Sequence, residues 1–281
     1  MKKITLLVAL CAAMNLLATE PEWSSEIEIE GQKITALNGQ NLHELLNASK
    51  IDKQKEMSVT FDLENSVLLF QNAFIVWSDA KTGPFLKIDE PLTIQVEGEN
   101  QIVLTDSKSF IETTRNVSFI GTQKEERDAL IVYGHSTEGS SGIFACLNGN
   151  DVNLEFEKVT VSANQCINAL VGSAGQAHKV TFNYAKFGMQ PQKEATLEIT
   201  DMVFNHSKIT KPAGAEFSPE LKGIAKDGKL VAGEQVIINL ADDEAIENIQ
   251  SETRNQKVFH DGQLLILRDG EVFNAQGARV E

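Results

Sequence analysis

The sequence predicts an all-β protein: a right-handed parallel β-helix (solenoid) with a capping helix before it and a β-hairpin tail after it. Three observations support this. An apolar cadence recurs through the middle of the chain, a short amphipathic segment precedes it, and a hairpin signal lies near the C-terminus. The right hand follows from the strong chirality of crossovers between parallel strands.

The cadence is an eight-residue pattern in which positions one, three, six and eight are apolar or small. Most copies begin about 20–30 residues apart, which is the length of one solenoid coil. Within each copy, apolar residues alternate with polar ones, so each half predicts a strand with one buried face. The doubled polar step between the halves predicts a bend from one sheet to the next. The copies are Leu68, Phe70, Ala73, Ile75; Leu154, Phe156, Val159, Val161; Val180, Phe182, Ala185, Phe187; and Leu197, Ile199, Met202, Phe204, with partial copies at Leu92, Ile94 and at Val117, Phe119.

Residues 1–18 have the features of a signal peptide. Lys2 and Lys3 are followed by the apolar run 4–13 and by Ala18, a small residue suited to cleavage. A lipoprotein anchored through Cys11 is the alternative. We therefore expect an exported protein on the cell exterior or the outer-membrane surface, with the periplasm as a second possibility.

Residues 19–56 are predicted to form an N-terminal segment that ends in the capping helix. Asn41 and Glu44 have the spacing of a capping box. A helix at this point would cover the apolar end of the first coil. The residues that share its apolar face are Leu42, Leu45 and Leu46.

The solenoid is predicted over residues 57–236. One interval, from Val117 to Leu154, is longer than the others and contains the strand-like segment 129–133. A whole further coil with a weak start is the favoured interpretation, and a loop that bulges from the side is the alternative. From residue 212 the pattern decays into a predicted end cap.

An acidic linker is predicted over residues 237–256, and a C-terminal tail over 257–281. In the tail, the segment 263–274 has two short strands around Asp269-Gly270, a strong hairpin signal. An isolated two-stranded hairpin is only marginally stable in water. The tail is therefore expected either to dock on the solenoid or to serve as a recognised tag.

Four segments of the tail carry a recognisable pattern: Lys257-Val258-Phe259, Asp261-Gly262-Gln263-Leu264, Arg268-Asp269-Gly270 and Asn274-Ala275-Gln276-Gly277. The tail resembles the short C-terminal tails of many exported Bacteroidales proteins, which look like abbreviated relatives of the type IX secretion sorting domain. The resemblance covers about a tenth of the chain, and the full sorting domain is longer and forms a β-sandwich. The central cadence is similar to that of β-helical surface proteins of these bacteria, some of which are carbohydrate-binding, and this implies a cell-envelope setting.

The charge of the chain excludes some partners. Removal of residues 1–18 would leave 23 basic and 40 acidic residues, a net charge of −17. Such a chain is repelled by nucleic acid, so nucleic-acid partners are not expected.

No stretch after the leader is long and apolar enough to span a membrane. The sequence carries no signal for oligomeric state.

No motif for catalysis, metal binding or cofactor binding is recognised. The segment 139–142 is a loop rather than a nucleophile elbow, and glycine-rich phosphate loops are absent. The histidines lack metal-ligand spacing, and there is no Cys-x-x-Cys. Catalytic residues, metal and cofactors are accordingly predicted as none. The five histidines are His43, His135, His178, His206 and His260.

A row of outward polar residues is the best candidate for catalysis. Glu155 and Glu157 lie two apart on one predicted strand and therefore share a face. Paired acids serve polysaccharide lyases and glycoside hydrolases, whereas the simpler interpretation is a solvated charged surface next to Lys158. By the expected register, the row continues through Thr181, Asn183, Glu198 and Thr200.

Exposed aromatic residues are the usual means of binding sugars without chemistry. Trp77 has the parity of a core residue, whereas Tyr184 falls in a polar step and is expected at an exposed corner; Trp23 and Tyr133 complete the candidates. The favoured function is a non-catalytic secreted or cell-surface protein that binds a glycan or another surface partner in an adhesin-like role, with ligand-binding residues unknown. The alternative is a β-helical polysaccharide lyase or glycoside hydrolase.

Two cysteines follow the leader, and the register argues against a disulfide between them. Alignment of 143–145 with 167–169 places Cys146 above Leu170 and Cys166 above Gly142. This offset along the strands exceeds the reach of a disulfide. We therefore expect buried free thiols, with a bridge as the alternative.

Overall fold

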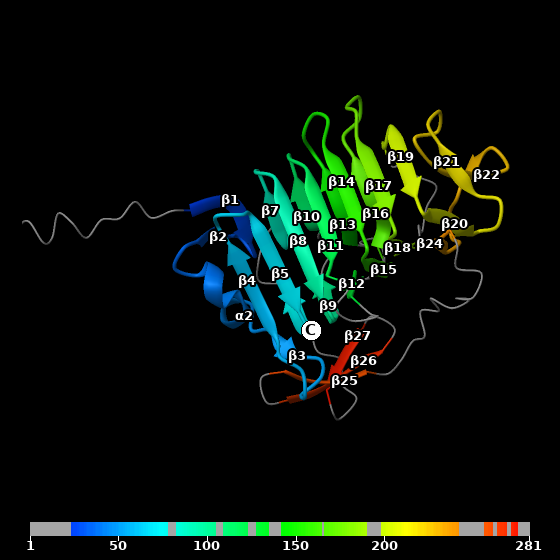
Figure 1. Ribbon diagram of the computed structural model, residues 1–281. Coiled ribbons are helices and arrows are strands. Elements are labelled where there is room, and N and C mark those ends of the chain that lie inside the picture. The colour runs from blue at the N-terminus through cyan, green and yellow to red at the C-terminus, as the bar shows by residue number, and fades with distance from the viewer. Residues whose placement is uncertain are drawn as a thin grey trace, which may run out of the picture.

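The computed structural model describes residues 24–77, 83–104, 109–122, 128–134, 142–164, 166–189 and 198–241, and the backbone of three strands within 256–274. The molecule is nearly all β, with parallel coils stacked into a β-solenoid of about four turns (Figure 1). This confirms the predicted fold class. The predicted signal peptide, Trp23 and residues 242–255 of the predicted linker lie outside the described residues.

Each coil contributes one strand to each of three sheets, in the order second, third and first sheet. The first sheet contains β1 (Ser24–Ile29), β2 (Gln32–Thr35), β7 (Leu86–Ile88), β10 (Ser109–Thr113), β13 (Gly142–Leu147) and β16 (Cys166–Gly172). The second contains β4 (Ser58–Asp62), β5 (Val67–Gln71), β8 (Leu92–Glu97), β11 (Val117–Gly121), β14 (Asn153–Glu157), β17 (Lys179–Asn183) and β19 (Asp201–Asn205). The third contains β3 (Ser49–Lys50), β6 (Ala73–Trp77), β9 (Glu99–Leu104), β12 (Ala129–Tyr133), β15 (Thr160–Asn164), β18 (Lys186–Met189), β20 (Ser207–Lys211) and β24 (Val236–Leu240).

A ladder of phenyl rings runs through the interior along the second sheet. Phe119 stacks on Phe156 with ring centroids 5.1 Å apart, Phe156 on Phe182 at 5.2 Å, and Phe182 on Phe204 at 5.5 Å. The first three rings are fully buried. Stacking of coils in register places like residues over like, so apolar residues of successive coils exclude water together.

A single residue in the left-handed backbone region turns the chain from the second sheet to the third. In the copies that begin at Leu68, Leu154 and Val180 it is the second residue of the polar step, which confirms that the step marks a bend in these copies. Most residues pay a steric cost in this region, and glycine does not. The residues are Asn72 (φ 48°), Gly98 (φ 64°), Lys158 (φ 53°), Tyr184 (φ 50°) and His206 (φ 53°).

The cadence places the core correctly in three of its four full copies. Every apolar position in the copies that begin at Leu68, Leu154 and Val180 is buried. The fourth copy is wrong by half a repeat, because Met202 pairs with Val180 and Phe204 with Phe182. The apolar pattern fits two alignments of this segment with the preceding coil. In one, the copy begins at Leu197, and in the other, which the structure shows, Met202 takes the first position.

The long interval after Val117 does not hold an extra coil. Strands β11, β12 and β13 form one coil, with β12 in register between β9 and β15. The additional length lies in the connections from Gly121 to Ala129 and from Tyr133 to Gly142. The favoured interpretation was therefore wrong, and long connections within one coil account for the interval.

The N-terminal end is closed by antiparallel strands on all three sheets, two on the first sheet and one on each of the others. Strand β1 pairs with β7, β4 with β5, and β3 with β6. The predicted helix is present as η1 (Gly39–Asn41) followed by α2 (Leu42–Leu45), and Leu42 and Leu46 are buried. The capping box is not formed, since the side chain of Asn41 makes no capping hydrogen bond. The 3₁₀ helix η1 leads directly into α2, so Asn41 belongs to η1 and does not cap the first turn of α2 with its side chain.

The C-terminal end is closed by a strand that turns back into the third sheet. Strand β24 lies antiparallel between β18 and β20, and Val236, Ile237 and Ile238 are buried. The packed cap thus extends beyond residue 236, into the range assigned to the acidic linker. Before it, a small antiparallel sheet contains β21 (Glu216–Ser218), β22 (Gly223–Lys226) and β23 (Lys229–Leu230).

The predicted tail hairpin is confirmed and has a third strand. Strand β26 (Gln263–Arg268) pairs antiparallel with β27 (Glu271–Asn274), and β25 (Gln256–His260) pairs with the other edge of β26. We call β25, β26 and β27 the tail sheet. The Asp-Gly turn predicts the pairing of β26 with β27, but it does not predict the pairing of β25 with β26.

The two cysteines are not bridged. Cys146 is a free, half-buried thiol, and its partner across the sheet is Val171, one residue beyond the predicted Leu170 because the register shifts after Gly142. Cys166 pairs with Gly142 as predicted. Burial raises the pKa of the Cys146 thiol, which lies 3.5 Å from the hydroxyl of Ser109.

Candidate functional site: an aromatic corner beside a polar row

The outward face of the second sheet carries the predicted polar row for two coils. Glu155 pairs with Thr181, and Glu157 pairs with Asn183, as expected. On the next coil the partners are Val203 and Asn205, not Glu198 and Thr200. The half-repeat error in the fourth copy explains this difference. The row therefore becomes less acidic along the solenoid and ends in two amides.

The two acids do not gain a third acidic partner from the next coil. The Glu157 carboxylate is 3.7 Å from the ammonium of Lys158, which offsets its charge. Glu198 forms an ion pair of 2.7 Å with Lys222 in the C-terminal cap. The simpler interpretation, a charged outward face, accounts for these contacts.

A stacked aromatic pair stands at the corner beside this row. The rings of Tyr184 and His206 are 4.1 Å apart and nearly parallel, at 10°. Their positions are equivalent on successive coils, and the backbone N–H of Tyr184 donates to the carbonyl of Asn205 at 3.0 Å. Tyr184 is 45% exposed, which confirms the expected exposed corner. The left-handed turn at both residues directs two aromatic side chains outward at one edge.

The environment of the pair is polar. Asn183 and Asn205 directly precede the two aromatic residues and pair with each other across the sheet. Lys158 occupies the equivalent corner one coil earlier. Flat rings flanked by amide donors and acceptors, with a cation nearby, form what we call the aromatic corner: Lys158, Asn183, Tyr184, Asn205 and His206. Such a surface can stack against an apolar face of a ligand while it hydrogen-bonds to hydroxyl groups.

Two other aromatic candidates, Trp77 and Tyr133, do not contribute to this corner. Trp77 is 1% exposed and packs edge-to-face on Phe85 in the interior, as its parity predicts. Tyr133 lies on the outer side of the third sheet, where it packs with Phe74 and Val103.

His178 is a buried structural residue. Its ring Nε2 accepts a hydrogen bond of 3.0 Å from the backbone N–H of Ser173, and the backbone N–H of His178 donates to the hydroxyl of Thr200 at 3.0 Å. Burial lowers the pKa of His178, against smaller opposing effects from the backbone of Val152 and Ser173 and the charge of Asp151. The neutral ring is therefore the folded form at neutral pH.

This arrangement predicts a pH effect on stability. In the unfolded chain, His178 is protonated below pH of about 6.5. In the folded chain its pKa is lower, so the ring stays neutral to a lower pH. Stability contributed by the neutral ring is present above pH of about 6.5 and is lost as pH falls. We expect His178→Gln to reduce the drop in Tm between pH 7.5 and 5.5. Equal drops in the two proteins would contradict this role.

The remaining histidines are not brought together. His43 lies in α2 at the N-terminal end, His206 at the aromatic corner, and His260 in the tail sheet; His135 lies outside the described residues. Over the described parts of the chain, no group of three His, Cys, Asp or Glu residues is placed to hold a metal ion.

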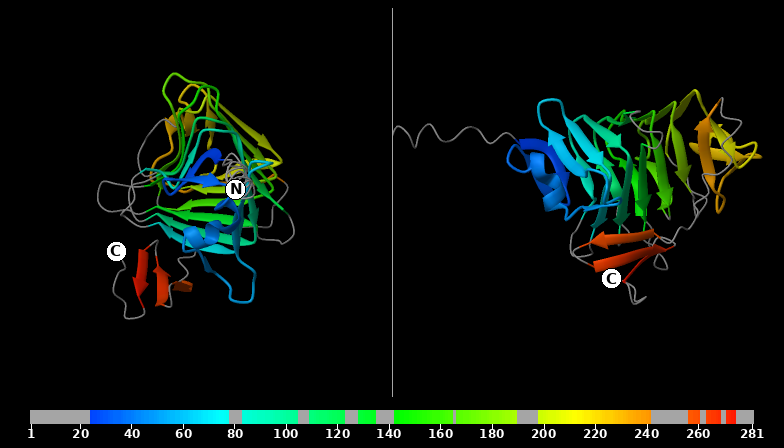
Figure 2. Two further views of the ribbon diagram at one scale, coloured as in Figure 1. Left: turned by 90° about the vertical axis from the view of Figure 1, so that its left-hand side faces the viewer. Right: turned by 60° about the horizontal axis from the view of Figure 1, so that its bottom comes forward.

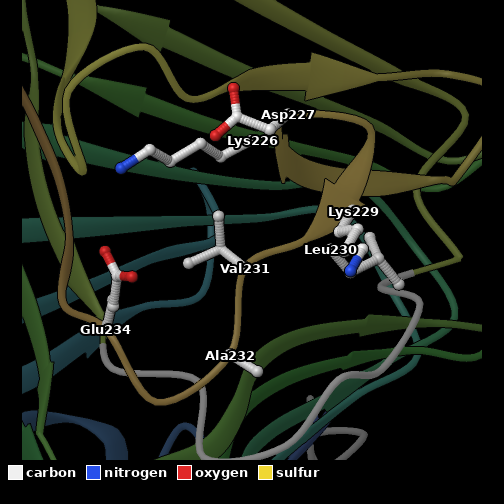
Figure 3. Close-up of a pocket in the computed structure, with 7 residues that line it drawn as sticks. All are labelled: Lys226, Asp227, Lys229, Leu230, Val231, Ala232 and Glu234. Carbon is white, nitrogen blue, oxygen red and sulfur yellow. The ribbon is translucent and has the colours of Figure 1, made fainter.

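Two cavities lie at the C-terminal cap. The larger, about 530 Å³, is open beside β22 and β23; Lys226 and Glu234 extend on one side, Lys229 and Leu230 lie on the other, and Val231 stands between (Figure 3). Its two lysines and two acids balance in charge, and it has no aromatic residue. The smaller, about 340 Å³, lies where the phenyl ladder ends and is lined by Met202, Phe204, Ser207, Lys208, Ile209, Ala215, Glu216 and Phe217.

No helix in the described part of the chain is long and apolar enough to cross a membrane. Comparisons with protein families, with curated proteins and with solved structures find no match for this chain.

Proposed function

We propose that this protein is an exported, non-catalytic β-solenoid that binds a glycan at the aromatic corner. The observation that carries the proposal is the stacked, exposed pair Tyr184–His206 beside the amides Asn183 and Asn205. A rigid pair of rings has little side-chain entropy to lose on binding, and the amides offer donors and acceptors for hydroxyl groups. The acidic chain favours a neutral or amine-bearing sugar over a polyanion.

Export and surface display are part of this proposal. The leader-like residues 1–18 and the resemblance of the tail to sorting tails support a secreted or cell-surface location. Cleavage after residue 18 is tested by N-terminal sequencing of the protein recovered from its native host.

Glycan binding is tested with an array and three purified proteins. Tyr184→Ala removes the exposed ring and should weaken binding at least about tenfold, about 1.4 kcal/mol. Tyr184→Phe keeps the ring, loses only the hydroxyl, and should bind within a few-fold of wild type. If Tyr184→Ala retains wild-type affinity for every glycan that binds, the corner is not the site. If the wild-type protein binds no glycan on the array, the proposal that its ligand is a glycan fails.

A polysaccharide lyase or glycoside hydrolase of β-helix type is the second candidate, because Glu155 and Glu157 share one outward row. It predicts release of reducing ends or unsaturated products from at least one member of a polysaccharide panel. Glu157→Gln should abolish that activity and leave stability unchanged, because the side chain lies on the outer face. An inactive wild-type protein on the whole panel would remove this candidate.

A further inference from the structure

The outer side of the third sheet is apolar at its N-terminal half. Along β6, β9 and β12, Ile75, Ile102 and Val132 point into the solenoid, so by alternation their neighbours point outward. Phe74 and Val103 are nevertheless 0% and 3% exposed. They form an apolar cluster separate from the interior, which we call the outer patch; its members are Ile51, Phe74, Val76, Val103 and Tyr133.

The second sheet shows what an uncovered outward row looks like. Its equivalent positions are Thr93, Ser118, Glu155 and Thr181, which are polar and half-buried. A solvated strand face alternates in this way, whereas buried outward phenylalanine and valine require a covering element.

The tail sheet lies in the position of that cover. In Figure 1 it lies below β9 and β12, and in both views of Figure 2 it lies to one side of the solenoid, outside the three sheets; β25 contacts β3. Strand β3 pairs with β6 at Phe74. The sequence of β26 contains the unbroken apolar run 264–267. A small sheet of this kind needs a packing surface to be stable.

We propose that the outer patch is the docking surface for the tail sheet of the same chain. The patch supplies the apolar surface that three short strands lack, and the tail excludes water from Phe74 and Val103. The tail is then a fixed part of the folded protein. A free, flexible tag would leave the patch exposed to water.

Tyr133, a member of the outer patch, is itself half-buried on the outer side of the third sheet. Burial is the largest cause that raises its pKa to about 12; the charge of Glu99 adds to the rise and a hydrogen bond with Asn164 opposes it. A tyrosine on the outer side of a sheet would titrate near 10 if water reached it.

Amide hydrogen exchange on the full-length chain tests the docking. Val103→Lys places a charge in the outer patch and should raise exchange in residues 256–274 to near the rate of an unstructured segment. The matched control is Val203→Lys, at an outward position on β19, which should leave exchange in the tail unchanged. Protection in β14 and β17 is followed in the same experiment to show that the solenoid stays folded. Unchanged protection of the tail in Val103→Lys would overturn the proposal.

A second measurement needs no change in the patch. The chain has two tyrosines, so Tyr184→Phe leaves Tyr133 as the single phenol to titrate by ultraviolet absorbance. We expect a midpoint near 12. A midpoint near 10 would mean that water reaches the patch, and the proposal would fail. A dimer that exchanges tails, detected by sedimentation, would likewise contradict docking within one chain.

Discussion

Phe156→Ala is expected to lower the free energy of unfolding by about 3–5 kcal/mol, the range for a buried phenylalanine replaced by alanine. Phe156 is 0% exposed and stands between Phe119 and Phe182 at 5.1 and 5.2 Å. Its removal opens a cavity in the middle of the ladder, and the rigid strands on either side limit collapse. The loss is measured by urea unfolding, followed by circular dichroism.

Phe204→Ala is the matched control. Phe204 is the last ring of the ladder, is partly buried, and stacks on Phe182 alone within the ladder. Less area leaves contact with protein when it is truncated, so the loss should be clearly smaller than at Phe156. Equal losses at the two positions would show that Phe156 does not sit inside a continuous stack.

Gly121→Ala is the second change with a large expected effect, a loss of about 1–3 kcal/mol or more. Gly121 ends β11, and a Cβ atom there would collide with the backbone carbonyl of Lys158 on the next coil. Backbone atoms cannot move aside as a flexible side chain can, so the two coils must separate locally. Thermal unfolding of the purified protein measures the effect.

Gly188→Ala provides the control for a change of the same type. Gly188 is also buried in a strand, but a Cβ atom there would come no closer than 3.8 Å, to the hydroxyl of Ser162. We expect a change within about 0.5 kcal/mol, as for an unstrained position. If Gly121→Ala leaves the free energy of unfolding unchanged, the close approach of Gly121 at the end of β11 to Lys158 after β14 would be contradicted.

The sequence predicts the interior of the solenoid well, because burial imposes a strict alternation on each strand. The residues of the copies at Leu68, Leu154 and Val180 were placed in the core from spacing alone, and all are buried. The bend at each polar step was also predicted, since two consecutive polar residues cannot both continue an alternating strand.

Register and strand direction were harder to predict. Met202 fits either half of the cadence, so the fourth copy was placed half a repeat too early. The alternation of Val59 and Phe61 in β4 is the same whether the strand runs parallel or antiparallel, so the antiparallel cap left no signal. Segment 129–133 was strand-like in sequence, but nothing local showed that it belonged to the existing coil.

The aromatic corner was only half predicted. Tyr184 was expected at an exposed corner, but His206 was not connected with it, because the two are separated by a whole coil and the expected register did not align them. Alignment of Val180 with Met202 brings Tyr184 and His206 to equivalent positions. The correct register would therefore have revealed the pair from the sequence.

Cross-linking across one pair of coils tests the stacking most directly. In a background with Cys146 and Cys166 replaced by serine, Glu155→Cys with Thr181→Cys places two thiols on facing positions of β14 and β17. Strand spacing of about 4.8 Å lies within the reach of a disulfide, so mild oxidation should bridge this pair. Glu155→Cys with Asn183→Cys, displaced by two residues, should stay reduced. Bridging of the displaced pair in place of the facing pair would contradict parallel coils in this register.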